Sequence, residues 1–312
     1  MNFPARLLLG FLILLAPAWA ADVAPPPTHA DLAYGPHARN RLDLWLPPST
    51  SATKPVPLVI FIHGGGFTKG DKAQAREQKL VQQCLAAGVA FASINYRFLG
   101  PETTLPAILR DCARALQFLR AEAKTWNLDP ARIATFGSSG GAGASLWLAF
   151  HPDLADPPNP DPVLRQSTRP TCVGALSTQF TYDFYRWEEV FGAATLARFD
   201  RQFRAPLFYG FTSDQDAQSP AGRALRADCD MLGLLTAAAP PVFLSTKHPA
   251  GDVQDYSHFL HHPQHAKVIY DRARELGVTV VADLPGYGLT PPADGPRTLR
   301  DFLFLHLRVP SP

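Results

Sequence analysis

Two apolar segments of the chain each lead into a run of glycines, and this arrangement constrains the fold more than any other feature. Residues 58–62 are all apolar, as is typical of a strand buried on both faces of a sheet, and they lead into His63-Gly64-Gly65-Gly66. Residues 132–136 form a second predicted strand, followed by Gly137-Ser138-Ser139-Gly140-Gly141 and a predicted helix over 142–150. Each glycine run therefore lies at the end of a predicted strand, and the second opens a helix.

The rest of the chain alternates predicted strands with predicted helices. Further strands are predicted at 42–46, 89–94, 173–176, 241–245 and 278–282, and further helices at 74–87, 105–126, 266–276 and 299–307. Such alternation implies right-handed crossovers, so we predict an α/β fold with a mostly parallel central sheet and helices on both faces. The region from about 178 to 239 is aromatic-rich and loses this rhythm, and we interpret it as an insertion over the sheet edge.

The N-terminus has the pattern of a secretory signal peptide. Arg6 is followed by an apolar stretch at 7–15, which is too short to span a membrane, and then by the small residues of Ala18-Trp19-Ala20. We predict cleavage after Ala20, which leaves one domain over 21–312 that is secreted or periplasmic and has no membrane span; the alternative is an uncleaved anchor. Mass spectrometry of the exported protein should find a chain beginning near Ala21, and a retained Met1 would contradict this prediction.

Composition excludes several classes of protein and leaves the cysteines open. With 46% hydrophobic and 18% charged residues the chain is not disordered, and a net charge of +2 gives no basic footprint for nucleic acid. An exported chain can hold disulfides, but the four cysteines have no metal-ligand spacing and allow three pairings, none of which the sequence selects: Cys84, Cys112, Cys172 and Cys229.

The second glycine run fits the pattern G-x-S-x-G. A nucleophile on a sharp strand-to-helix turn needs small neighbours two residues away on each side, because a β-carbon there would clash with the returning backbone. This spacing selects Ser139 as the candidate nucleophile and places Ser138 one residue too early. The alternative is a glycine turn that packs a helix closely or holds a phosphate.

The first glycine run supplies a candidate oxyanion hole. Consecutive glycines allow backbone N–H groups to approach a carbonyl oxygen closely, and the residue after the nucleophile adds a further N–H group. We therefore predict that Gly65, Gly66 and Gly140 bind the developing oxyanion. A flexible loop without a role is the alternative.

With both turns in this order, the stretch 56–150 resembles the esterase/lipase branch of the α/β-hydrolase superfamily, and specifically the hormone-sensitive-lipase-like esterases. The matching pieces are the HGGG turn, Asn95-Tyr96-Arg97, the segments 111–119 and 128–133, and the turn at 137–143. The resemblance implies an α/β-hydrolase fold and a catalytic triad in the order Ser, Asp, His. The family usually has an acid or glycine in place of Ser138 and an alanine in place of Gly140, and both changes keep the turn feasible.

The resemblance places the acid after the strand at 241–245, where Asp252 and Asp255 are candidates and Asp255 is preferred. It places the base in the turn after the last strand, but Leu289 stands there, and leucine cannot accept a proton. Instead, histidines crowd the preceding segment: His248, His258, His261, His262 and His265. We predict that one of them serves as a displaced base, with His262, fixed by Pro263, and His258 as the best candidates and His262 as the choice.

Two further interpretations of this segment stay open. The spacing of three and four between its histidines can face a metal ion on one side of a helix, but Pro263 interrupts such a helix, so we expect neither metal nor cofactor. The missing family histidine also allows a non-catalytic relative that binds or scaffolds. We predict a carboxylic ester hydrolase that acts by an acyl-enzyme route on small-molecule or polysaccharide-linked esters.

Overall fold

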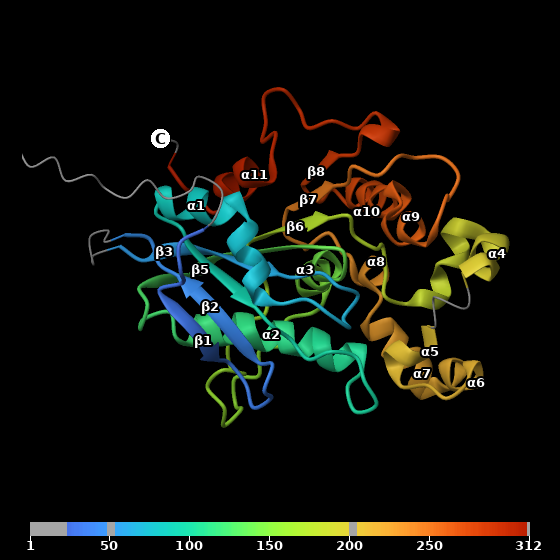
Figure 1. Cartoon of the computed structure of the whole chain (residues 1–312), viewed down its shortest axis with the longest axis horizontal. Helices are drawn as coiled ribbons and strands as arrows, with labels where there is room; N and C mark the ends of the chain where they lie inside the picture. Colours follow the sequence, from blue (N-terminus) through green and yellow to red (C-terminus); the bar gives the residue numbers. More distant parts are fainter. Residues whose placement is uncertain (1–23, 49–53, 200–204, 311–312) are drawn as a thin grey trace, which may run out of the picture.

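The computed structural model describes residues 24–48, 54–199 and 205–310, and its centre is one sheet of eight strands. The strands lie in the order β1-β2-β4-β3-β5-β6-β7-β8 (Figure 1). Their bounds are His29–Ala33, Arg41–Trp45, Val56–Ile62, Ala90–Ile94, Leu128–Ser138, Cys172–Leu176, Val242–Ser245 and Val280–Asp283 for β1 to β8. β2 pairs antiparallel with both of its neighbours, β1 and β4, and all other pairs are parallel, which confirms the predicted α/β class.

Successive residues of β3 face the two sides of the sheet, and each side carries its own apolar core. Leu58, Ile60 and Ile62 belong to the core beneath α2 (Leu105–Ala121), α3 (Gly140–Phe150) and α10 (Pro263–Glu275). Val59 and Phe61 belong to the opposite core, covered by α1 (Lys79–Ala86) and α11 (Leu299–His306). Since every β3 residue is buried, the uniformly apolar run of the sequence reflects a strand covered on both faces (Figure 1).

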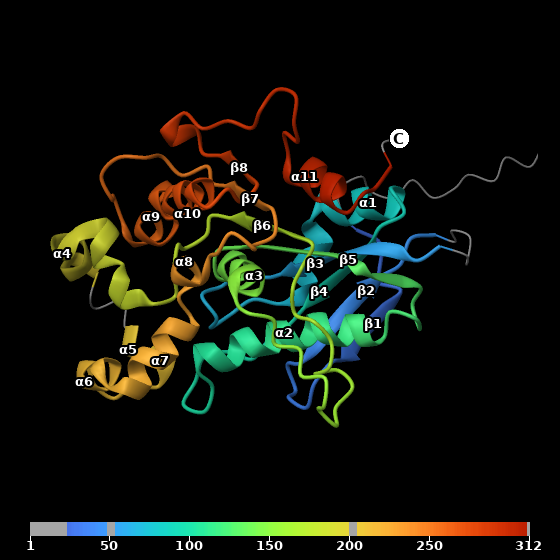
Figure 2. The ribbon, with the colours of Figure 1, turned by 180° about the vertical axis from the view of Figure 1, so that it is seen from behind.

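The region from 178 to 239 is a helical insertion between β6 and β7. It contains η2 (Phe184–Arg186), α4 (Glu188–Phe199), α5 (Ala205–Tyr209), α6 (Asp214–Gln218), α7 (Pro220–Asp228) and α8 (Met231–Leu234). Seen from behind, α4 to α7 form one end of the molecule and adjoin α9 (Tyr256–His261) (Figure 2). Two aromatic contacts join them: Phe199 stacks on Phe259 with ring centroids 5.0 Å apart, and Phe191 meets Phe259 at 5.3 Å.

Several boundaries differ from the predictions for local reasons. The predicted helix at 74–87 is divided into η1 (Lys72–Glu77) and α1, because Gln78 has an extended backbone. β1 was not predicted, since its polar sequence HADLA lacks a strand pattern and its pairing with β2 forms it. A short turn, η3 (Pro285–Tyr287), follows β8 where the family histidine was expected.

Three predictions on the chain as a whole have different outcomes. The predicted signal peptide, residues 1–20, lies outside the described residues and stays a prediction. All four cysteines are free and buried, so the structure contains none of the three possible disulfide pairings. Among the described residues, no helix combines the length and the apolar character that crossing a membrane requires.

Candidate active site

Ser139 lies in the turn between β5 and α3, in a backbone conformation that side-chain-bearing residues rarely adopt, with φ 52° and ψ −122°. Its N–H donates to the Leu176 carbonyl at 2.9 Å, which ties the turn to β6. A β-carbon on Gly137 would lie 2.4 Å from the Gly141 carbonyl carbon, and one on Gly141 would lie 2.0 Å from the Ile62 oxygen. Both glycines of the pattern are therefore required, and they leave Ser139, not Ser138, at the apex of the turn.

The glycine-rich loop after β3 lies directly against this turn. A β-carbon on Gly64 would be 3.5 Å from the Ser139 β-carbon, and one on Gly140 would be 3.6 Å from the Gly66 nitrogen. Gly65 and Gly66 have φ values of +109° and +59°, which favour glycine. The structure thus places Gly66 next to Gly140, whereas Gly65 lies against Lys69 and its role as an oxyanion donor stays a prediction. The first N–H groups of α3 have no partner within the helix.

His63 supports this loop from below. Its ring is buried, stacks on Tyr96 with centroids 4.2 Å apart, and has its Nδ1 2.7 Å from the Gly64 carbonyl oxygen. The Tyr96 hydroxyl donates to the His63 carbonyl at 2.8 Å. Burial lowers the pKa of His63 to about 4, so the ring is neutral near pH 7 and holds the loop rather than exchanging protons.

The imidazole that meets Ser139 belongs to His261. Its Nε2 lies 2.9 Å from the Ser139 Oγ, and its Nδ1 lies 2.9 Å from the Ser257 carbonyl oxygen. Because a carbonyl only accepts, Nδ1 carries the proton and Nε2 is left bare, ready to accept the Ser139 proton. Burial lowers the pKa of His261, while the hydrogen bond to Ser257 raises it and the charge of His248 lowers it. His261 is therefore neutral near neutral pH.

The local sequence explains why His261 has this place. Asp255 accepts a hydrogen bond from the His258 N–H at 2.8 Å and so caps the N-terminus of α9. Pro263 begins α10, and His262 between the two helices has an extended backbone. His261 therefore stands at the last turn of α9, four residues after Ser257, and its side chain reaches back to the carbonyl of that turn.

The structure does not support His262 as the base. Its Nδ1 accepts from the Gln264 N–H at 3.0 Å and its Nε2–H donates to the Gly251 carbonyl at 2.8 Å, so both ring nitrogens are held by backbone. Asp255 is likewise not paired with the base, because its carboxylate caps α9. Asp252 is exposed, and His261 makes its second hydrogen bond to a carbonyl rather than to either aspartate. The predicted assignments of His262 and Asp255 are corrected by this geometry.

His258 and His265 are also held by backbone groups. His258 accepts from the Gln254 N–H at 3.2 Å and lies 2.8 Å from the Pro249 oxygen. His265 accepts from the Phe180 N–H at 3.4 Å and lies 3.0 Å from the Phe259 oxygen, and burial lowers its pKa to about 3. The ring of His258 thus stabilises the loop before α9, and the ring of His265 connects α10 to the start of the insertion. No group of three metal-ligating side chains occurs in the part of the chain that the structure describes.

Leu289 lies where the family histidine was expected, and its role there is structural. Its carbonyl accepts from the Leu284 N–H at 2.8 Å and its N–H donates back to the Leu284 carbonyl at 3.3 Å, which closes the turn around η3. The side chain packs against the main apolar core. The imidazole of the site thus comes from the loop after β7 instead of the turn after β8.

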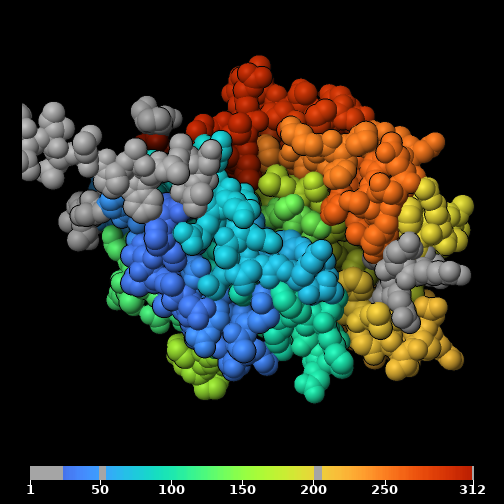
Figure 3. All heavy atoms as spheres, viewed as in Figure 1, coloured from blue at the N-terminus to red at the C-terminus, as the bar shows by residue number. Residues whose placement is uncertain are grey.

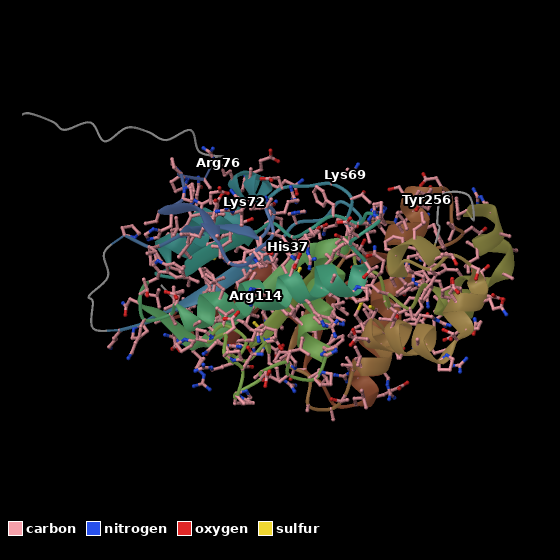
Figure 4. The ribbon with its side chains drawn as sticks, turned by 90° about the horizontal axis from the view of Figure 1, so that it is seen from below. His37, Lys69, Lys72, Arg76, Arg114 and Tyr256 are labelled. Atoms are coloured by element: carbon pink, nitrogen blue, oxygen red, sulfur yellow. The ribbon has the colours of Figure 1, made fainter. Side chains whose placement is uncertain are left out.

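Both turns lie at the carboxyl edge of the parallel strands, and the molecule is hollowed there. Figure 3 shows a depression between the segment near residues 65–100, in cyan, and the segment near 250–265, in orange, with green residues at its floor. In Figure 4, Lys69 at the end of the glycine-rich loop and Tyr256 at the start of α9 lie along the same edge of the molecule. Ser139 itself is half-buried.

The family model BD-FAE matches residues 42–176, which include both glycine turns. The match covers less than half of the chain. The strand order and the turn after β5 that carries Ser139 show that the chain has the α/β-hydrolase fold. The match and the similar curated proteins support the resemblance to the esterase/lipase branch.

The chain is similar to several known proteins. It is 29% identical, over 69% of its length, to a probable carboxylic ester hydrolase, LipM, of Mycobacterium tuberculosis. It is 35% identical over 38% of its length to a probable isoprenylcysteine alpha-carbonyl methylesterase of Arabidopsis thaliana. The matched part of this chain spans only 46% of the length of LipM and 27% of the length of the methylesterase.

Solved structures share its fold at low sequence identity. The acetyl ester-xyloside bifunctional hydrolase of Caldicellulosiruptor lactoaceticus aligns with a TM-score of 0.60 at 21% identity, over 82% of this α/β-hydrolase and 85% of that chain. A truncated carbohydrate esterase from gut microbiota aligns with a TM-score of 0.64 at 14% identity, over 93% and 99%. These likenesses establish the fold.

Proposed function

We propose that this α/β-hydrolase hydrolyses carboxylic esters through an acyl-enzyme on Ser139, with His261 as the general base. The observation that carries the proposal is the distance of 2.9 Å between Ser139 Oγ and the bare Nε2 of His261. It lies within the range of hydrogen bonds that transfer a proton. The similar proteins described above are named as ester hydrolases, which supports the same reaction.

The reaction proceeds in two balanced halves. His261 Nε2 takes the hydroxyl proton while Ser139 Oγ bonds to the ester carbonyl carbon, and the oxygen gains a negative charge beside the glycine N–H groups. The carbonyl re-forms, the bond to the alcohol oxygen breaks, and the imidazolium returns its proton to that oxygen. Water then repeats these steps on the acyl-enzyme, which releases the acid and frees Ser139.

The Ser257 carbonyl replaces one of the two roles of a triad carboxylate. It fixes the tautomer, because only a protonated Nδ1 can donate to it. It carries no full charge, so it stabilises the imidazolium less than an aspartate does. We therefore expect a working dyad with a slower chemical step than a complete triad.

We further propose that the substrates are small or carbohydrate-linked esters met outside the cytoplasm. The hollow at this face of the molecule, the predicted signal peptide and the names of two structural neighbours, an acetyl ester-xyloside bifunctional hydrolase and a carbohydrate esterase, support this. Wild type should hydrolyse p-nitrophenyl acetate and release acetate from acetylated xylo-oligosaccharides, whereas Ser139→Ala should do neither. Activity confined to long-chain esters would contradict the substrate class.

The rival function is that of a non-catalytic binding relative, favoured because, among the residues that the structure describes, a carbonyl and not a carboxylate meets the Nδ1 of His261. The same experiment distinguishes the two. A folded wild type that hydrolyses no ester and does not react with a serine-directed phosphonate would favour the rival.

A further inference from the structure

A second imidazole lies face to face with the ring of His261. His248 follows β7, and its ring centroid is 5.5 Å from that of His261 with 20° between the planes. The side chain is half-buried, and its backbone N–H donates to the Thr246 hydroxyl at 3.3 Å. Among the residues that the structure describes, no hydrogen bond holds the ring nitrogens of His248, so the ring meets its neighbours through its face.

The two hydrogen bonds of His261 lie in the plane of its ring, so only packing against the faces of the ring can fix its tilt. Ser139 and Ser257 hold the two nitrogens, and both hydrogen bonds allow the ring to tilt about the line that joins them. A flat ring stacked on one face opposes that tilt and keeps Nε2 directed at Ser139. A carboxylate on Nδ1 would restrict the ring further, but here the partner is a carbonyl, so stacking matters more.

The charged and titratable groups around His248 come from four parts of the fold: α9, α10, the loop after β7 and the end of β8. From α9, His261 stacks on it, and His258 lies at 6.1 Å with 18° between the planes. The ring of His262, at the start of α10, is tilted by 33° against that of His258, with centroids 4.7 Å apart. From the β7 loop itself, Lys247 turns away to Asp283, at the end of β8, at 3.2 Å. Because His258 and His262 each accept a backbone N–H, protonating either ring would break a hydrogen bond.

We propose that His248 is a positioning residue for His261: its ring holds the base in line with Ser139, and a positive charge on that ring opposes protonation of the base. The proposal rests on the proposed function, because it assigns His248 a role in that same proton transfer. A neutral ring face stabilises an imidazolium stacked on it, whereas a second positive charge at this distance repels it. The charge of His248 indeed acts to lower the pKa of His261, in addition to the larger effect of burial.

The test separates stacking from charge with two variants. His248→Phe keeps a flat ring but cannot titrate, and His248→Ala removes both features; exposed His37→Ala is the matched control. The kcat/KM for a short aryl ester is measured from about pH 5 to about pH 8, and the pKa of the His261 imidazole is followed by NMR.

We expect His248→Phe to keep kcat within about 3-fold of wild type near pH 8. The acid limb of its kcat/KM–pH profile and the pKa of His261 should both move upward by about half a pH unit. Two unit charges 5.5 Å apart in a water-like medium interact by that amount. In His248→Ala the same upward shift should accompany a kcat loss of about 10-fold with KM nearly unchanged, as expected for a misaligned base. His37→Ala should match wild type.

Two results would overturn the proposal. The first is a pH profile and a pKa of His261 that do not move in His248→Phe. The second is a loss in His248→Phe as deep as in His261→Ala, which would make His248 itself the proton acceptor. If wild type shows no hydrolysis that depends on Ser139, the proposed function fails, and the NMR shift alone then decides whether the two rings are coupled.

Discussion

His261→Ala is expected to lower kcat for a short aryl ester by a factor on the order of 10²–10⁴, with little change in KM. The reason is that Ser139 at its free pKa is a weak nucleophile, and His261 Nε2 is the group within 2.9 Å that can accept its proton. The alanine variant should fold, because His261 is only partly buried and its Nδ1 bond lies within one helical turn. Initial rates at saturating substrate measure the loss, and thermal unfolding checks the fold.

The matched control for this variant is the neighbouring histidine. His262→Asn keeps an acceptor for the Gln264 N–H and therefore preserves the cap of α10. It should retain activity within about 5-fold, because His262 does not touch Ser139. A large loss in His262→Asn together with near-normal activity in His261→Ala would reverse the assignment.

Ser139→Ala is expected to remove ester hydrolysis by a factor on the order of 10³ or more, because no acyl-enzyme can form. Its methyl group fits the same turn, since the glycines beside it, and not the hydroxyl, relieve the crowding of the backbone. Ser138→Ala is the matched control: this side chain is exposed at the end of β5 and should be dispensable. Hydrolysis of a short aryl ester by the three purified proteins is the measurement, and equal rates in wild type and Ser139→Ala would refute the nucleophile.

The nucleophile turn could be predicted from sequence because its cause is local. Small residues at 137 and 141 are forced by contacts within the turn and with Ile62, so the five-residue pattern contains the whole constraint. The buried strand β3 was predictable for a similar reason, since a strand covered on both faces requires an unbroken apolar run. β1 was missed because pairing with β2, not its own residues, makes it a strand.

The imidazole that meets Ser139 lies in the segment in which the sequence placed the base, one residue before the predicted His262. Which of the two adjacent histidines faces Ser139 depends on where α9 begins and ends. A shift of the helix by one residue turns every side chain to a different direction around the helix axis. The sequence did contain a signal: Asp255 followed by His258 fits a helix N-cap, and Pro263 marks the start of the next helix. Taken together, they place His261 in the last turn, four residues after Ser257.

The acid could not be identified from the sequence because the structure assigns the base no carboxylate. Asp255 fits the family order, and its preference followed from that resemblance, but its carboxylate accepts the His258 N–H. A backbone carbonyl as the partner of an imidazole leaves no trace in residue types, since every residue has one. Only the distance of 2.9 Å between His261 Nδ1 and the Ser257 oxygen reveals it.

The most direct test of the central claim is the rate at which a fluorophosphonate modifies Ser139. This reaction uses the serine and its base but needs no natural substrate, and mass spectrometry locates the adduct. The account predicts an adduct on Ser139 in wild type, near-normal labelling in His262→Asn, and labelling slower by a factor on the order of 10² or more in His261→Ala. Labelling of His261→Ala at the wild-type rate, or an adduct on Ser138, would contradict the account.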